Sequence, residues 1–163
     1  EEMTKTIYLA GGCFWGVEAY FKNINGIVET EVGYANGKSD KTTYEEVAKT
    51  DHAETVEVKY DEEKISLQEI LEYLYYIIDP FSINKQGNDR GRQYRTGIYS
   101  NDKEVLEKVQ SFLDKKQENE EKEIQVEVGE LKNFVIAEDY HQDYLDKNPT
   151  GYCHVDLNDV PNL

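Results

Sequence analysis

The sequence predicts an α+β fold, a two-layer sandwich with helices on one side of a mostly antiparallel sheet. Strand and helix patterns alternate along most of the 163 residues. Two segments, 27–35 and 55–60, alternate apolar side chains with glutamate or lysine, so one face of each strand meets water. A doubly wound parallel sheet would bury both faces, and its strands would be apolar throughout. The alternation therefore favours the sandwich.

The first strand is predicted over residues 7–10, and a glycine-rich turn, Ala-Gly-Gly-Cys-Phe-Trp-Gly, follows over residues 10–16. A helix is predicted next, because apolar residues recur at helical spacing: Val17, Tyr20, Phe21 and Ile24. Cys13 then lies at a helix start, where unpaired amides and the helix dipole favour a thiolate over a thiol. Phe14 and Trp15 supply the walls of a small apolar pocket. A nucleophile beside that pocket is our working hypothesis.

Other interpretations of this turn are available. A cysteine inside a protein is often a small buried hydrophobic residue with no chemistry. Glycines between a strand and a helix also occur in dinucleotide-binding folds, but Cys13 stands where that fingerprint needs its middle glycine. A thiolate at the turn would repel a phosphate group. A structural cysteine and a nucleophile both stay open at this point.

Two longer helices are predicted to cover the sheet. The first begins with a Ser66/Glu69 capping box and presents one apolar face until Asp79-Pro80 stops it. The second spans residues 102–116, with inward positions Val105, Leu106, Val109, Phe112 and Leu113. Between them, residues 81–95 form a polar, glycine-punctuated loop of the kind that carries function.

The C-terminal part is predicted to be a helix over 138–147 followed by a tail. Residues 150–163 show little periodicity, so we expect a coil-like tail mobile enough to move Cys153. The chain length fits one catalytic domain over residues 1–163.

Composition excludes several classes of partner. The formal net charge of −16 opposes binding to nucleic acid or anionic membranes, which need a basic surface. No apolar run reaches about 18 residues, so we expect no membrane span. Cys13 and Cys153 lie 140 positions apart in a chain without a secretory pattern, which suggests reactive thiols in a reducing cytoplasm.

Short motifs along nearly the whole chain resemble one enzyme family, the A class of peptide methionine sulfoxide reductases. Seven of them stand in register over residues 11–149. They are Gly11-Gly12-Cys13-Phe14-Trp15-Gly16, Tyr44-Glu45-Glu46-Val47, His52-Ala53-Glu54, Gln86-Gly87-Asn88-Asp89, Gln93-Tyr94-Arg95, Ala137-Glu138-Asp139-Tyr140-His141-Gln142 and Lys147-Asn148-Pro149. The resemblance implies a ferredoxin-like βαββαβ core and a reductase of methionine S-sulfoxide, free or in proteins, working as a monomer.

The resemblance also implies roles for individual residues. Cys13 is the nucleophile, and Glu54 is the acid, because a carboxyl shielded from water can keep its proton near pH 7. Tyr44 and Tyr94 are expected to donate hydrogen bonds to the sulfoxide oxygen, and Asp89 to position the substrate. Phe14 and Trp15 are expected to hold its S-methyl group.

Attack by Cys13 is expected to release methionine and leave a sulfenic acid on this residue. Cys153, the other thiol of the chain, is expected to form a disulfide with it, which thioredoxin or another dithiol then reduces. No flavin, nicotinamide or metal is expected. A zinc site is disfavoured because the chain has three histidines and no Cys-x-x-Cys.

Two other classes of function remain as alternatives. One is a binding module that recognises methionine or its sulfoxide without turnover, and the other is a thiol peroxidase. Ile78 departs from the family pattern, in which many members carry histidine before Asp79-Pro80. Some members carry selenocysteine at the position of Cys13.

Overall fold

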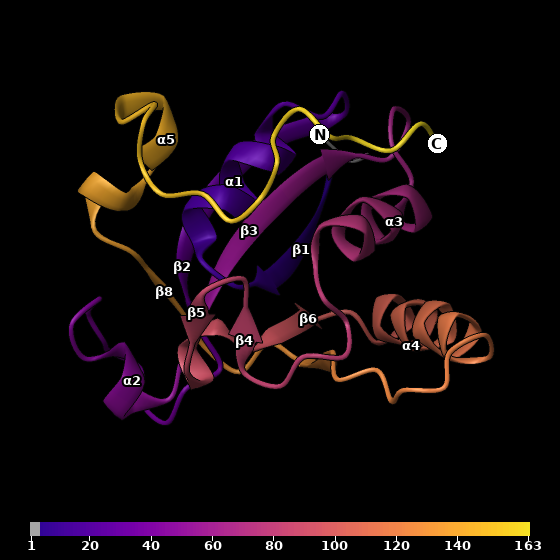
Figure 1. Cartoon of the computed structure of the whole chain (residues 1–163), viewed down its shortest axis with the longest axis horizontal. Coiled ribbons are helices and arrows are strands. Elements are labelled where there is room, and N and C mark those ends of the chain that lie inside the picture. The colour runs from indigo at the N-terminus through magenta and orange to yellow at the C-terminus, as the bar shows by residue number, and fades with distance from the viewer. Residues whose placement is uncertain (1–3) are drawn as a thin grey trace.

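The computed structural model describes residues 4–163, which form a main sheet of six strands (Figure 1). Their order is β7-β6-β1-β3-β2-β8. The strands are β1 (Thr4–Gly11), β2 (Ile27–Ala35), β3 (Ala53–Asp61), β6 (Thr96–Ser100), β7 (Glu127–Glu130) and β8 (Phe134–Ile136). Every neighbouring pair is antiparallel except β6 and β7. The predicted mostly antiparallel sheet is confirmed.

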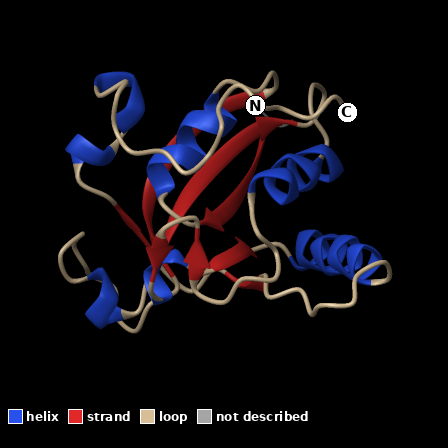
Figure 2. Ribbon diagram, viewed as in Figure 1, coloured by secondary structure: helices blue, strands red, loops and turns tan. Residues whose placement is uncertain are grey.

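Five α-helices and two short 3-10 helices accompany the sheet within residues 4–163 (Figure 2). The α-helices are α1 (Phe14–Lys22), α2 (Val47–Thr50), α3 (Leu67–Ile77), α4 (Lys103–Gln117) and α5 (Tyr144–Lys147). The 3-10 helices are η1 (Arg92–Tyr94) and η2 (Asp139–His141), and a small hairpin pairs β4 (Lys85–Gln86) with β5 (Asp89–Arg90).

The core lies between one face of the sheet and helices α1, α3 and α4. Along β1, Ile7 and Leu9 face this core, whereas Ala10 belongs to a smaller cluster on the opposite face. Each of the three helices contributes apolar side chains to the larger cluster, among them Phe14, Val17, Phe21, Ile70, Leu74, Val109 and Phe112. The opposite face is covered by Leu131 and Phe134. The predicted two-layer arrangement is confirmed.

The two long helices begin where their capping residues predict. Ser66 accepts a hydrogen bond from the Glu69 amide, and the Glu69 carboxylate accepts one from the Ser66 amide, which completes the capping box. Asp102 caps α4 through the Glu104 amide. Without the short α2, the β4–β5 hairpin and η1, the elements up to β6 follow one another as β1-α1-β2-β3-α3-β6, and the ferredoxin-like assignment stays an interpretation of this order.

Strand β2 departs from its predicted alternation at one end. Val28 is 60% exposed, although the alternating pattern places it with buried Val32 and Tyr34. The cause is a β-bulge: Ile27 pairs with Tyr60 and Glu29 with Lys59, so Val28 has no partner on β3. A bulge inserts one residue and turns the preceding side chains to the other face.

The helix predicted over 138–147 is wrong as a single element. The structure has η2 and α5 instead, separated by Gln142 and Asp143. Asp143 has a φ of 54°, which no continuous right-handed helix allows. Gln142 instead bonds both backbone groups of Val32 on β2, with N···O and O···N distances of 2.9 Å. These bonds tie the segment to the sheet.

The C-terminal segment after α5 has no regular secondary structure and crosses in front of α1 (Figure 1). Val155 is buried and belongs to the main core. Further along, Asp159 accepts a hydrogen bond from the hydroxyl of Tyr76 on α3. Among the helices of residues 4–163, none has the length and apolar character that crossing a membrane requires.

Candidate active site

Cys13 occupies the N-cap position of α1, at the end of β1, and is 5% exposed. The residue before it needs to be glycine for two reasons. Gly12 has a φ of 93°, and a Cβ built on it would lie 2.7 Å from Cβ of Gln86. The predicted strand-to-helix turn is therefore confirmed, and the backbone here packs directly against the loop that carries β4.

Glu54 lies beside this turn, although it is 41 positions away in the sequence. The residue sits on the face of β3 that also presents buried Val56 and Val58, the face that α1 covers. It is 1% exposed, and its Oε1 accepts the backbone N–H of Phe14 at 3.1 Å. Its buried Oε2 has no hydrogen-bond partner within residues 4–163. Glu54 is thus bonded to the backbone of the residue that follows Cys13, and its second carboxyl oxygen is left for a ligand.

The environment of Glu54 favours its acid form. Burial raises its pKa to about 8, the nearby charge of Asp89 adds to the rise, and the Phe14 amide opposes it. At pH 7 most of the Glu54 side chains therefore carry a proton. This matches the sequence-based expectation of a shielded, protonated carboxyl.

The expectation of a Cys13 thiolate is not met. Burial, and then the charge of Glu54, raise the pKa of Cys13 well above its usual range. Amides of Trp15 and Gly16 lower it, but the first amide of the helix, that of Phe14, is taken by Glu54. The amides of the first turn of α1 are divided between the Cys13 sulfur and the Glu54 carboxyl. In the substrate-free site Cys13 is therefore a thiol.

Tyr44, Tyr94 and Asp89 belong to the same site. Burial is the main cause that raises the pKa of Tyr44 to about 12, and the charges of Glu54 and Cys13 add to the rise. Burial raises the pKa of Tyr94 too, and Glu54 is again the next cause. Asp89, on β5, acts on both phenols and leaves its buried Oδ2 without a partner among the described residues. The structure therefore brings these three predicted residues together around Cys13 and Glu54.

Cys153 lies in the C-terminal segment, against the first turn of α1. Its Sγ donates to the carbonyl of Val155 at 3.1 Å and lies 3.1 Å from where a Cβ on Gly16 would stand. Both cysteines are free thiols in this structure. The preceding residue, Tyr152, lies close enough to Asp89 and Cys13 for their charges to raise its pKa, after burial.

The comparisons with known proteins decide the family. A model of peptide methionine sulfoxide reductase matches residues 5–162. The chain belongs to the peptide methionine sulfoxide reductase family. It is similar to Mxr1 of Saccharomyces cerevisiae in its reduced form, at 40% identity and a TM-score of 0.86, covering 93% of this chain and 90% of that one. It is also similar to methionine sulfoxide reductase A of Corynebacterium diphtheriae, at 34% identity and a TM-score of 0.85, covering 94% and 79%.

A third similar structure is Mxr1 of Saccharomyces cerevisiae in complex with Trx2, at 28% identity and a TM-score of 0.63, covering 88% of this chain and 86% of that one. The resemblance to the A class and the predicted enzyme class, a methionine sulfoxide reductase, are confirmed.

In this reductase the two predicted pocket residues have different surroundings. Phe14 is fully buried and packs against the rings of Tyr34 and His141, so it belongs to the core. Trp15 is half-buried, stacks on Tyr144 with ring centroids 3.8 Å apart, and donates from Nε1 to Nδ1 of His141 at 3.0 Å. Of Phe14 and Trp15, only Trp15 therefore has a part of its ring accessible to a ligand.

Sequence reasoning missed the residue that organises this side of the site. Glu138 accepts hydrogen bonds from the Tyr34 hydroxyl at 2.7 Å and from the Tyr44 amide at 3.1 Å. His141, one turn later, receives the bond from Trp15 and touches the ring of Tyr44. The family motif over 137–142 was the available signal. The interpretation of His141 as a hydrogen-bonded structural residue agrees with these contacts.

Arg95 plays the corresponding part for Tyr94. Its guanidinium is 6% exposed and donates to three backbone carbonyls, those of Asn36, Asp51 and Arg92, at 2.9–3.1 Å. These bonds fix η1, which carries Tyr94, against the loops that flank β2 and β3. His52, which follows Asp51, forms a hydrogen bond between its Nδ1 and the Thr50 hydroxyl at 2.8 Å. Within residues 4–163 there is no cluster of three or more side chains that could hold a metal ion.

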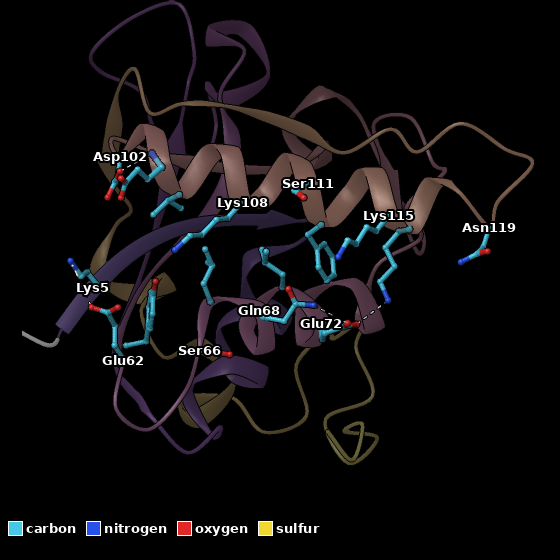
Figure 3. Close-up of a pocket in the computed structure, with 17 residues that line it drawn as sticks. Lys5, Glu62, Ser66, Gln68, Glu72, Asp102, Lys108, Ser111, Lys115 and Asn119 are labelled. Carbon is cyan, nitrogen blue, oxygen red and sulfur yellow. Dashed lines mark hydrogen bonds and ion pairs between the residues drawn. The ribbon is translucent and has the colours of Figure 1, made fainter.

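A large groove of about 790 Å³ lies elsewhere, between α3 and α4 (Figure 3). It contains none of the predicted site residues. Its charges largely compensate one another, as in the ion pairs Lys5–Glu62 at 3.7 Å and Lys116–Glu72 at 3.0 Å. This groove is therefore separate from the residues that are expected to carry the chemistry.

Proposed function

We propose that this chain reduces methionine S-sulfoxide, free or in proteins, with Cys13 as the nucleophile and Glu54 as the proton donor. One observation carries the proposal: a buried carboxyl, whose pKa is raised to about 8, is held on the Phe14 amide directly beside the Cys13 thiol. A sulfoxide is a weak electrophile until its oxygen is protonated or strongly hydrogen-bonded. Glu54 supplies that proton while Cys13 attacks the sulfur.

The step balances without an external reagent. The Cys13 sulfur is oxidised by two electrons to a sulfenic acid, and the sulfoxide sulfur is reduced by two electrons to the thioether. The oxygen moves from one sulfur to the other. The proton that Glu54 gives to the oxygen stays on the sulfenic acid, and the thiol proton of Cys13 passes to Glu54, so the carboxyl is protonated again for the next cycle.

Tyr44 and Tyr94 complete the oxygen site in this proposal. Burial and the neighbouring carboxyls raise the pKa values of both phenols, so they stay protonated and act as neutral donors. Such donors stabilise negative charge that develops on the oxygen. Asp89 positions the substrate, and Trp15 with Phe14 behind it confines the S-methyl group. Fixed places for both methyl and oxygen select one epimer.

Recycling follows through Cys153 and an external dithiol. The Cys153 thiol condenses with the sulfenic acid on Cys13, which gives a disulfide and water. We assign the reduction of that disulfide to thioredoxin, supported by the structure of the Saccharomyces cerevisiae relative in complex with Trx2. No prosthetic group takes part in this scheme. Residues 1–163 then act as one catalytic domain and a monomer, with 150–163 as its resolving tail, in the reducing cytoplasm.

The mass of the chain tests the proposal. The reduced protein is mixed with one equivalent of methionine S-sulfoxide, and the chain should lose about 2 Da as the disulfide forms, while methionine appears. A chain of unchanged mass indicates a binding module instead. A thiol peroxidase would be oxidised by hydrogen peroxide at least as fast as by the sulfoxide.

A further inference from the structure

The residue after Cys153 occupies a site of its own on the catalytic turn. His154 is half-buried, and its Nε2 lies 3.0 Å from the carbonyl oxygen of Gly11, two residues before Cys13. The imidazole thus connects the C-terminal segment directly to the backbone that carries the nucleophile. None of the motifs used above includes this histidine.

Three residues without side chains make room for the imidazole: Gly12, Gly16 and Gly87. Cβ atoms built on them would lie 3.1 Å from Nε2, 3.4 Å from Nδ1 and 3.1 Å from Cβ of His154, in that order. The first and last of these distances are tighter than ordinary van der Waals contact. The three glycines come from the turn, from α1 and from the β4–β5 hairpin, so the slot exists only in the assembled site.

The hydrogen bond to Gly11 fixes which nitrogen carries the proton. A carbonyl oxygen only accepts, so Nε2 must be the donor. Burial lowers the pKa of His154, so its ring is neutral and Nδ1 is left as an unprotonated, buried atom without a partner among residues 4–163. The His154 ring is therefore held in the slot by a single hydrogen bond, from Nε2–H to the Gly11 carbonyl.

The position of this ring determines where Cys153 lies. The Cys153 Sγ is 3.1 Å from where a Cβ on Gly16 would stand, and Gly16 lies in the first turn of α1, which begins directly after Cys13. The Cys153 thiol is therefore held against the helix turn that follows the nucleophile. Val155, buried on the other side of His154, adds a second anchor.

We propose that His154 is a positioning residue for the resolving step: seated in the glycine slot, it holds the tail so that Cys153 stays within reach of Cys13. The inference rests on the proposed function, in which Cys153 attacks the sulfenic acid. The Cys153 thiol keeps its hydrogen bond to the Val155 carbonyl until Cys13 is oxidised. It then moves to the Cys13 sulfur, while the His154 ring keeps its hydrogen bond to the Gly11 carbonyl. In this way the tail is held without occupying the place of the substrate.

The test compares His154→Ala with His154→Gln in rapid-quench single turnovers on methionine S-sulfoxide. Methionine release reports the step on Cys13, and the mass loss of about 2 Da reports the disulfide. Loss of one neutral hydrogen bond should slow disulfide formation in His154→Ala about 3- to 10-fold, with methionine release unchanged. Glutamine, whose amide can donate to Gly11, should restore the rate. Asn158→Ala is the matched control, an exposed residue of the same tail, and should behave as wild type.

Three results separate the possibilities. Disulfide formation at the wild-type rate in His154→Ala overturns the positioning role. Equal slowing of both steps, or no recovery with glutamine, also overturns it, because a general structural defect affects both readouts. A wild-type protein that forms neither methionine nor disulfide contradicts the proposed function itself, whatever the variants do.

Discussion

Replacing Glu54 by glutamine separates proton donation from packing at the centre of the site. Oε1 of Glu54 accepts the Phe14 amide at 3.1 Å, and the amide oxygen of glutamine can accept the same bond. The other oxygen, buried and without a partner among the described residues, becomes an NH2 group. That group can donate a hydrogen bond to a sulfoxide but cannot give up a proton. The shape of the site is preserved while its acid is lost.

The expected loss of rate follows from general acid catalysis, which contributes about 10²- to 10⁴-fold. Glu54→Gln should therefore slow the first turnover by about 100-fold or more. With a pKa of about 8, the protonated fraction of Glu54 falls from about nine-tenths at pH 7 to about one-tenth at pH 9. The wild-type first turnover should drop about 10-fold over this range. The variant should show no such drop.

The same substitution that lowers the rate should raise the stability of the folded protein. The pKa of Glu54 rises from 4.5 to about 8 on folding, so between these values the folded state binds more protons than the unfolded state. Stability therefore falls as pH rises through this window, with no penalty below about pH 4.5 and the full penalty above about pH 8. At about 1.36 kcal/mol per pKa unit, that penalty is on the order of 5 kcal/mol. Glutamine avoids it, so the variant should gain stability relative to wild type between pH 5 and pH 9.

Rapid-quench methionine release and urea unfolding at several pH values measure the two effects. Glu57→Gln is the control, because it makes the same change on the same strand, at a half-buried carboxylate that accepts the Tyr8 hydroxyl at 2.8 Å. It should alter neither the first turnover nor its pH dependence. Equal wild-type rates at pH 7 and pH 9, or a Glu54→Gln variant within 10-fold of wild type, would refute the assignment of Glu54 as the acid.

Four further substitutions test other parts of the structure. Cys153→Ser should release one equivalent of methionine, gain about 16 Da as a sulfenic acid, and then stall with thioredoxin; sustained turnover removes Cys153 from the mechanism. Tyr94→Phe and Tyr44→Phe should each slow the first turnover about 10- to 100-fold, the worth of a hydrogen bond to developing charge, as rapid-quench rates would show. Ser66→Ala, which breaks the α3 capping box, should cost about 1 kcal/mol in urea unfolding and leave turnover intact.

Elements with a strong local pattern were predicted closely. The strand predicted over 27–35 is β2 with the same bounds, and the helix predicted over 102–116 is α4 within one residue at each end. Alternation and capping are properties of neighbouring residues, so the sequence contains them directly. The position of Cys13 at a helix start was predictable for the same reason.

Features that depend on distant partners were not predicted. The bulge at Val28 exists because of the register between β2 and β3, and the break at Gln142 exists because its side chain bonds the backbone of Val32. Neither partner can be identified from local sequence. Family motifs brought Tyr44, Tyr94 and Glu54 into one site. The motifs also contain Glu138 and Arg95, but they do not show which backbone groups these two side chains bond.

The protonation state of Cys13 shows why this distinction matters for chemistry. The local rule, that a helix start lowers the pKa of a cysteine, concerns one turn of backbone. In the folded chain, β3 brings Glu54 to the first helical amide, and burial removes the water that would solvate a thiolate. Both effects come from residues far away in the sequence, and together they exceed the two amides that remain for the sulfur. The same burial that keeps the proton on Glu54 therefore keeps one on Cys13, so the proposed nucleophile has to give up its proton as it attacks the sulfoxide.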